Sequence, residues 1–380
     1  MNFNIRTLAV MCSVSFSLSV NSQVTIGSDE KPAAGALLQL KNIDGVEGSG
    51  PNSTKGLGLP RIEILPNGKI KGSESLTLDN ELMGMIGYNI VETDEYCIGL
   101  HVWDGSQWID LTNKQAINET NNYDSSTGIL QDVEGNQYTT ARFGDAGIWM
   151  TQNLRTEKYY KCGELRDFAI NGLGGAVDSD SERQIGYPNV FGASISTKAY
   201  FNNRPELGVL YNWCAATNRV NATADEENDL TGVQGICPDG WHVSSTQEVI
   251  RLVEEVNQNT SKYSTLNDIK STDLGKENTG LGRAMLSSNQ PKIGTKAHHG
   301  VSNSNDNNGF NMYALGYGLS GIVNSAGGEA TIYANIWAAS NSNSVSAYYF
   351  YSVLNDGGEY IRLKNVWNKR ALFPVRCKKN

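Results

Sequence analysis

Residues 236–256 read ICPDGWHVSSTQEVIRLVEEV and carry the clearest structural signal in the chain. Ser245 stands three residues before Glu248, the spacing of a capping box, in which two side chains bond the free backbone N–H groups at the start of a helix. Apolar residues at the spacing of one helical face come next: Val249, Ile250, Leu252, Val253 and Val256. The stretch therefore predicts a helix that opens at Ser245.

Short strand-like segments surround this helix. Aromatic-rich segments cover residues 333–339, 347–353, 360–363 and 372–377, while Asn and Gly dominate residues 303–328. Apolar and polar residues also alternate from residue 128 to residue 150, with a turn at residues 134–136. One long helix among many short strands predicts an α+β fold for this half of the chain.

Residues 23–111 read as a smaller β-rich module. Apolar runs at residues 24–27 and 36–40 are short, and Asp104-Gly105 supplies a hairpin turn before Trp108. Residues 112–127 contain almost no apolar residue, which is the composition of a linker. We therefore predict two domains joined by this linker.

The first 22 residues have the pattern of a signal peptide. Arg6 precedes a modest apolar run that is too short and too interrupted to span a bilayer, and Val20 and Ser22 suit cleavage before Gln23. Lipidation of Cys12 stays open as an alternative, although the small residue normally placed just ahead of a lipidated cysteine is lacking. No later segment is long and apolar enough to cross a membrane, so we expect an exported protein at the cell surface or outside the cell.

The net charge excludes two kinds of binding surface. The chain has 31 Lys and Arg residues against 40 Asp and Glu, a formal net charge of −9. A fold-wide basic surface for nucleic acid and a polybasic membrane patch are therefore excluded.

Separated blocks from about residue 130 to residue 380 resemble the Fibrobacter succinogenes major paralogous domain, a family of exported bacterial proteins. The blocks lie at residues 132–138, 148–156, 210–213, 236–243, 309–318, 336–340 and 373–377. Cys214 departs from the pattern, because the family often has an aromatic residue after the Tyr-Asn-Trp block. The resemblance implies an α+β domain over residues 128–380 with a C-type-lectin-like, or formylglycine-generating-enzyme-like, fold and no established catalytic activity.

Residues 23–111 resemble an N-terminal module common in exported Bacteroidetes proteins. The matching segments are residues 24–27, 55–61, 87–89 and 97–108. The resemblance implies a stalk or oligomerisation piece, and a homotrimer among the partners.

Five cysteines remain once the signal peptide is removed, and in an oxidising compartment pairing is the default. The two ends of a lectin-like domain meet at one sheet, so the resemblance implies a Cys237–Cys377 bond. Cys162–Cys214 is the next candidate, against the alternative that Cys214 is a buried small hydrophobe. Cys97 then remains without a partner in the chain, either as an unreactive buried thiol or in a disulfide between subunits.

Catalysis has little support in the sequence, and we expect no enzyme. No Gly-x-Ser-x-Gly elbow lies near a histidine. His242 precedes the helix cap, where a structural hydrogen bond is the plainer interpretation. A formylglycine-generating activity would need a reactive cysteine pair, whereas these cysteines look like structural cross-links.

We expect no cofactor, with calcium left open. Residues 178–182 place carboxylates at alternate positions, and residues 303–308 offer amide and carboxylate oxygens. The sugar-coordinating tripeptides of calcium-dependent lectins are absent, since Lys292 follows Gln290-Pro291. A solvated acidic loop is the alternative. His298-His299 has no further metal ligand at suitable spacing.

Aromatic residues near the C-terminus are the best functional hint. Some of Tyr348, Tyr349, Tyr351 and Trp367 should alternate outward from strands and could stack on sugars; the alternative is the ordinary surface of a β-rich protein. We therefore expect a non-catalytic adhesion or ligand-binding protein whose target is a glycan or a surface protein. A purely structural component of a surface fibre or matrix is the second hypothesis.

Overall fold

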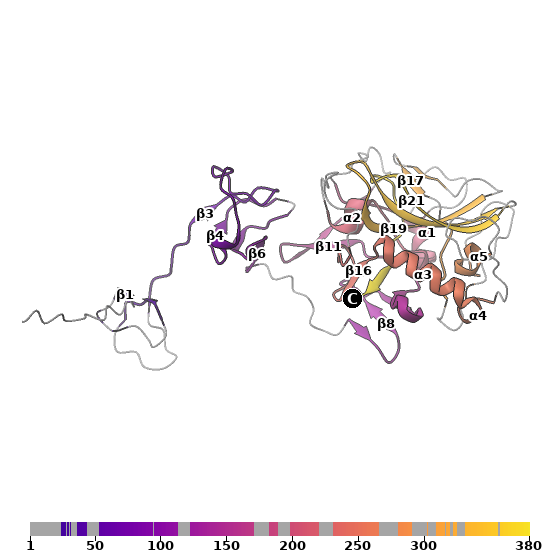
Figure 1. Ribbon diagram of the computed structural model, residues 1–380, viewed down its shortest axis with the longest axis horizontal. Coiled ribbons are helices and arrows are strands. Elements are labelled where there is room, and N and C mark those ends of the chain that lie inside the picture. Colours follow the sequence, from indigo (N-terminus) through magenta and orange to yellow (C-terminus); the bar gives the residue numbers. More distant parts are fainter. Residues whose placement is uncertain are drawn as a thin grey trace, which may run out of the picture.

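A computed structural model gives the structure of the chain (Figure 1). It describes residues 24–27, 29, 31, 36–43, 53–93, 95–112, 122–170, 182–188, 198–219, 231–265, 280–290, 302, 309–315, 317–319, 322–324, 331–355 and 358–380. The expected signal peptide, residues 1–22, and most of the expected linker lie outside these residues.

The N-terminal module contains two separate sheets. β1 (Val24–Ile26) and β2 (Leu38–Leu40) form a parallel pair. The second sheet has the order β3-β4-β5-β6 and is built from β3 (Arg61–Ile62), β4 (Ile86–Asn89), β5 (Gly99–Trp103) and β6 (Trp108–Asp110), with a 3-10 turn at η1 (Asn80–Leu82).

The core of this module lies on one face of the four-stranded sheet. Trp103 and Trp108 are register partners on β5 and β6, their rings meet edge to face with centroids 5.7 Å apart, and Ile64 packs with them. The predicted turn connects the two strands, and Gly105 adopts φ = 102°, a conformation that favours glycine.

A six-stranded sheet begins the C-terminal domain, in the order β16-β22-β10-β9-β8-β7. Its strands are β7 (Tyr123–Asp124), β8 (Ile129–Gln131), β9 (Gln137–Arg142), β10 (Ile148–Met150), β16 (Trp241–Val243) and β22 (Cys377–Lys379). Tyr123 pairs with Leu130 of β8, so the last part of the expected linker over 112–127 includes a strand of this sheet.

Three long strands form the second large sheet: β19 (Thr331–Asn341), β20 (Ser346–Asn355) and β21 (Gly358–Asn368). The smaller strands are β11 (Lys158–Lys161), β12 (Glu164–Asp167), β13 (Ala169–Ile170), β14 (Gln184–Gly186), β15 (Leu210–Tyr211), β17 (Tyr317–Leu319) and β18 (Ile322–Asn324). The short helices are η2 (Gly144–Ala146), α1 (Lys198–Asn203), η3 (Pro205–Leu207), α2 (Trp213–Thr217), α4 (Thr260–Tyr263) and α5 (Leu281–Met285).

The predicted helix is α3 (Thr246–Gln258), with both hydrogen bonds of the capping box. Ser245 accepts from the Glu248 backbone N–H, and the Glu248 carboxylate accepts from the Ser245 backbone N–H. Val249, Leu252, Val253 and Val256 are buried, so the predicted apolar face packs into the domain. Strands nevertheless predominate, and the described protein is β-rich with few helices.

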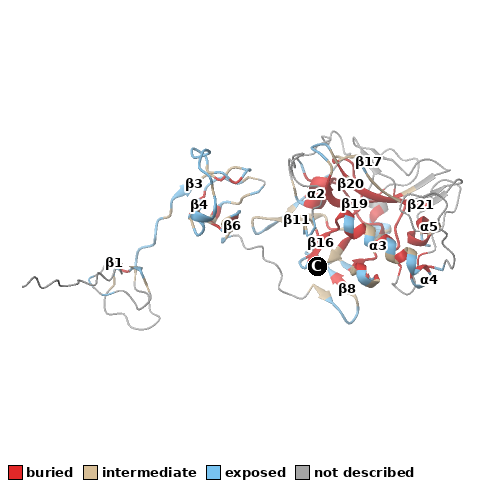
Figure 2. Ribbon diagram, viewed as in Figure 1, coloured by how far each residue is buried: buried red, intermediate tan, exposed pale blue. Residues whose placement is uncertain are grey.

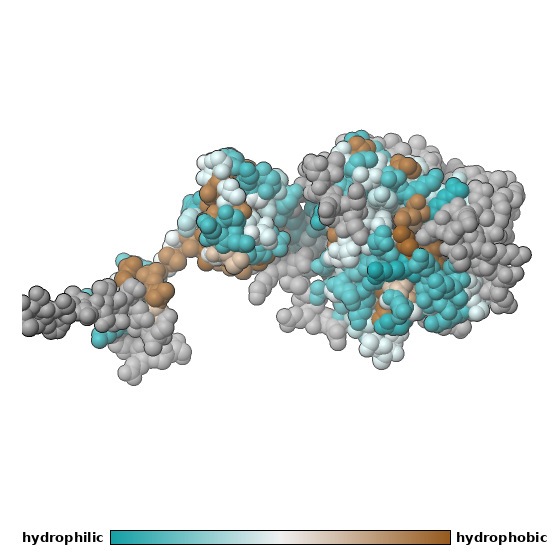
Figure 3. All heavy atoms as spheres, viewed as in Figure 1, coloured by the Kyte–Doolittle hydropathy of each residue, from teal (hydrophilic) through white to brown (hydrophobic). Residues whose placement is uncertain are grey.

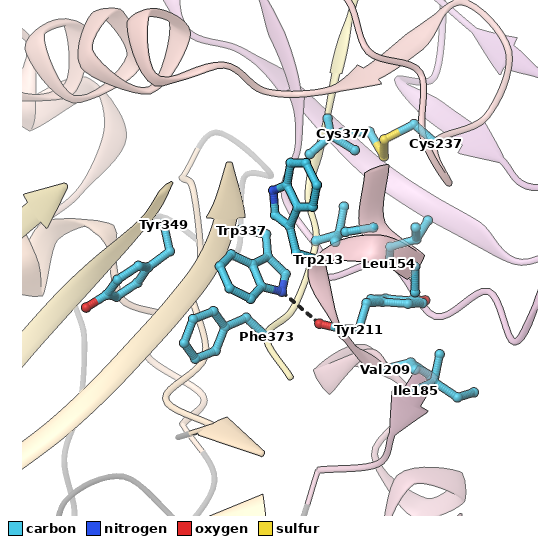
Figure 4. Close-up of a cluster of buried hydrophobic side chains, with 14 of the residues drawn as sticks. Leu154, Ile185, Val209, Tyr211, Trp213, Cys237, Trp337, Tyr349, Phe373 and Cys377 are labelled. Atoms are coloured by element: carbon cyan, nitrogen blue, oxygen red, sulfur yellow. Dashed lines mark hydrogen bonds between the residues drawn. A yellow bond between two sulfur atoms is a disulfide. The ribbon is translucent and has the colours of Figure 1, made fainter. Parts of the chain in front are cut away.

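Both faces of the central part of the β19–β21 sheet are covered (Figure 2). One face supplies Trp337 and Tyr349 to a core shared with Tyr211 and Phe373; the other supplies Phe350 to the core around α3 and α5. Figure 4 shows the first core, where the Trp337 indole N–H donates to the Tyr211 carbonyl at 2.7 Å. This sheet is therefore the central layer of the domain.

Candidate functional site

Two of the four candidate ligand-binding aromatics are buried. Tyr349 is 4% exposed and Tyr351 is 5% exposed, and their rings stack with centroids 5.6 Å apart. Burial raises the pKa of both phenols above the usual value. The expectation that these two residues stack on a ligand is wrong, because β20 is the central strand of a sheet that is covered on both faces.

Trp367 is half-buried and also faces this core. Its indole ring meets the ring of Phe373 edge to face, with centroids 5.9 Å apart. Its register partner, Ala347, is fully buried on the same side of the sheet. Packing in the core therefore accounts for much of the surface of the Trp367 side chain.

Tyr348 differs from its neighbours because it lies opposite a β-bulge in β21. Ala347 pairs with Trp367 and Tyr349 pairs with Lys364, so Tyr348 alone stands opposite two residues of β21, Asn365 and Val366. Since Ala347 and Trp367 face the core, alternation puts Tyr348 and Val366 on the other side of the sheet.

The surface around this bulge is partly apolar. Tyr348 is half-buried, Val366 is 66% exposed, and Val345 in the preceding turn is 48% exposed. We call Val345, Tyr348, Asn365 and Val366 the bulge patch. It offers an aromatic ring, aliphatic surface and an exposed amide at one end of the sheet.

The disulfides divide into one inside the C-terminal domain and one between the domains. Cys237 is bonded to Cys377, which fastens the segment before β16 to the last strand, β22. Cys162 is bonded to Cys97, not to Cys214, so the expected Cys162–Cys214 pair is wrong. Cys214 keeps its thiol, fully buried in α2, and the expectation that Cys97 is the leftover cysteine is also wrong.

The Cys97–Cys162 bond lies at the tip of the β11–β12 hairpin. Cys162 and Gly163 form its two-residue turn with φ values of 55° and 79°, and both positive values are required by a type I′ turn. Figure 1 shows this hairpin reaching from the C-terminal domain towards the N-terminal module.

Ion pairs reinforce the same contact. The two carboxylate oxygens of Glu92 accept from the two terminal nitrogens of Arg166 at 2.6 and 3.0 Å, and Lys161 Nζ lies 3.3 Å from Glu92 Oε1. The hydrogen bond from Arg166 is the main reason why the pKa of Glu92 is lowered. We call Glu92, Cys97, Lys161, Cys162 and Arg166 the interdomain clamp.

The four-stranded sheet of the N-terminal module has an uncovered apolar face. Five residues share it by register, because Ile86 pairs with Val102, Val102 with Ile109 and Tyr88 with Leu100. Ile86 is 44% exposed and Tyr88 is 41% exposed, although the opposite face holds the tryptophan core. We call Ile86, Tyr88, Leu100, Val102 and Ile109 the bare face. Hydrophobic residues are visible on this module and around β1 in Figure 3.

His242 belongs to a buried polar cluster at the C-terminus. Its Nε2 lies 2.9 and 3.0 Å from the Glu248 oxygens, its Nδ1 lies 2.5 Å from Asn380 Oδ1, and Lys378 Nζ lies 3.1 Å from Glu248 Oε1. Burial by itself would raise the pKa of Glu248, but the hydrogen bonds from His242 and from the Ser245 N–H lower it to about 2. The cluster ties together β16, α3 and β22.

Arg376 is a buried cation that sequence reasoning missed. Its Nε donates to Asn153 Oδ1 at 2.8 Å, one terminal nitrogen donates to the Asn311 carbonyl at 2.6 Å and the other to the Phe310 carbonyl. Burial lowers the pKa of Arg376 to about 9. The only available signal was a lone arginine in the apolar terminal segment.

The calcium hypothesis falls largely on residues that the structure does not describe, namely 178–181 and 303–308, and His298-His299 also lies there. Among the described side chains, no group of three or more His, Cys, Asp or Glu residues is arranged to hold a metal ion. Within the same described residues, every helix is too short or too polar to span a membrane.

Two family models match the chain. Residues 25–126 match a phage tail like trimerisation region. Neither the curated proteins nor the solved structures contain a match. Residues 144–379, more than half of the chain, match the Fibrobacter succinogenes major domain, and the chain therefore belongs to that family.

Proposed function

We propose that this chain is an exported, non-catalytic binding protein of the cell surface or the extracellular space. In this proposal the C-terminal domain has a lectin-like fold and binds a glycan or a surface protein. The N-terminal module forms a trimer, so that each assembly carries three copies of the C-terminal domain. Two disulfides support export, because such bonds persist in oxidising compartments.

The lectin-like fold has support in how the domain closes. β10 and β22, from the two ends of the domain, are neighbours in the six-stranded sheet. The Cys237–Cys377 bond fastens the last strand at this place. The two ends of the domain meet in one sheet, as the family resemblance implies for a lectin-like fold, and this feature supports the proposed fold.

The bulge patch is the observation that carries the binding proposal. β-bulges redirect side chains and are over-represented near functional sites. Tyr348 lies at such a bulge beside exposed Val366 and Asn365. A tyrosine ring can stack on a sugar ring or an apolar side chain while its hydroxyl forms hydrogen bonds. Asn365 adds an amide that can donate to, and accept from, hydroxyl groups.

A glycan array probed with the full chain tests this proposal. We expect binding to at least one glycan, and a loss of tenfold or more in Tyr348→Ala. Leu165→Ala, an exposed apolar residue on the β11–β12 hairpin, is the control and should bind as the wild type does. Binding that is equal in Tyr348→Ala and the wild type would remove the bulge patch from the proposal.

A structural component of a surface fibre or matrix is the second candidate, and the match to a trimerisation region favours it. A trimer that binds neither glycans nor the surface proteins of cells would support this second function. Ligand binding that requires Tyr348 would support the first.

A further inference from the structure

We propose that the bare face, together with the β1–β2 pair, is the interface through which three copies of this chain associate. The inference rests on the trimeric display proposed above and names the surface that would carry it. Both surfaces are apolar, and within the described residues the chain covers neither of them.

The β1–β2 pair is too small to be stable by itself. Each strand has only three residues, and Val24 pairs with Leu38 while Ile26 pairs with Leu40. These four side chains are 38–57% exposed. Two-stranded sheets without a covered apolar face are marginal in water, so this pair needs a further surface to pack on.

The bare face is larger than the β1–β2 pair and also needs a surface to pack against. It presents adjacent apolar side chains from three neighbouring strands, β4, β5 and β6. Ile90 and Leu111 continue the alternation just beyond the strand ends and are 47% and 42% exposed. Contiguous apolar patches of this kind on soluble proteins mark interaction sites.

The interdomain clamp leaves this face accessible. Glu92 and Cys97 lie in the loop between β4 and β5, at the end of the sheet, and the hairpin of the C-terminal domain attaches there. The C-terminal domain is therefore held without covering Ile86, Val102 or Ile109.

Further copies of the same chain are the occupant that fits both surfaces. Figure 1 shows β1 and the four-stranded sheet separated by an extended segment. A partner that covers both surfaces must carry two apolar surfaces at the same spacing. A second copy of this chain, aligned in parallel with the first, carries two such surfaces. The five residues of the bare face are uncharged, and the one charged register partner, Arg61 beside Tyr88, lies at its β3 edge.

Three copies are favoured over two by the match to a trimerisation region, which spans residues 25–126 and contains both surfaces. A threefold arrangement is closed, so it covers every copy of the face and leaves none to recruit more chains.

Light scattering of the full chain tests the interface. We expect the wild type to have three times the chain mass, and the double variant Ile86→Glu/Val102→Glu to have one third of the wild-type value. These two residues are cross-strand partners on the bare face. Val133→Glu, on an exposed valine of the C-terminal domain, is the matched control and should stay trimeric.

A second variant separates loss of the interface from loss of folding. Ile109→Cys should form intermolecular disulfides under mild oxidation, whereas Leu165→Cys on the C-terminal domain should not. A trimeric wild type whose double variant also stays trimeric, with no Ile109→Cys cross-link, overturns this interface while trimeric display stands. A monomeric wild type overturns both.

Discussion

Cys162, at the tip of a hairpin of the C-terminal domain, is bonded to Cys97 of the N-terminal module. The two residues lie 65 positions apart, so the bond closes a loop that contains the connection between the domains. The domains are consequently joined twice, once by the backbone and once by the clamp. The orientation of the C-terminal domain relative to the module then depends on the redox state of one cysteine pair.

Removing the clamp should free the two domains from each other. In Cys97→Ser/Cys162→Ser, small-angle scattering of the full chain should give a broader distribution of distances than in the wild type. Glu92→Gln should have a much smaller effect, because a partly exposed ion pair contributes about 1 kcal/mol or less. Cys214→Ala, which keeps both disulfides, is the control, and a double variant whose profile equals the wild type would show that the bond constrains nothing.

The Cys237–Cys377 bond should stabilise the C-terminal domain. The cysteines are 140 positions apart, and a chain-entropy model gives about 5 kcal/mol for a loop of this length. In Cys237→Ala/Cys377→Ala, hydrogen exchange of the β22 amides should accelerate, since that strand is fastened at Cys377. Unchanged exchange in β22, measured beside the β9 amides as an internal control, would contradict this role.

Acid should destabilise the domain through Glu248. Its pKa in the folded protein is about 2, below the ordinary value of 4.5, so its contribution to stability is complete above about pH 4.5 and is lost as the pH falls towards 2. The wild type should be more stable than Glu248→Gln above this window, by about 3 kcal/mol from the size of the shift, and the difference should shrink below it.

Urea unfolding at several pH values measures this difference. Glu254→Gln, an exposed carboxylate on the same helix, is the matched control. A difference between the wild type and Glu248→Gln that stays constant from pH 6 to pH 2 would show that the carboxylate is not stabilised by its neighbours.

Arg376→Ala should be among the most destabilising single substitutions. It would leave Asn153 Oδ1 and the carbonyls of Phe310 and Asn311 buried without this donor, and unsatisfied buried groups cost about 1–3 kcal/mol each. Arg251→Ala, on the exposed side of α3, should change the unfolding free energy by less than about 0.5 kcal/mol. Equal urea midpoints for the two variants would refute the role of Arg376.

Local patterns in the sequence predicted the local structure well. The capping box at Ser245 and Glu248 and the hairpin turn at Asp104-Gly105 were recognisable because each depends on residues close in the chain. The failures concern long-range contacts. Tyr349 and Tyr351 are buried because hydrophobic cores pack on both faces of the sheet around β20, which alternation along one strand cannot reveal.

The Cys97–Cys162 pair was missed for a related reason. The pairs that the resemblance and the sequence predict lie within one domain, whereas this bond joins two. Residues 158–167 read KYYKCGELRD, and the central Cys-Gly could have been recognised as a two-residue hairpin turn that places Cys162 at an exposed tip. Its partner in the other module could not be identified from the same pattern.

Sedimentation equilibrium of the oxidised full chain, at several loading concentrations, tests the proposed trimer most directly. We predict one species at three times the chain mass, which is 41.4 kDa before any leader is removed. A single species at the mass of one chain across the micromolar range would mean that the apolar faces of the N-terminal module do not bring copies together.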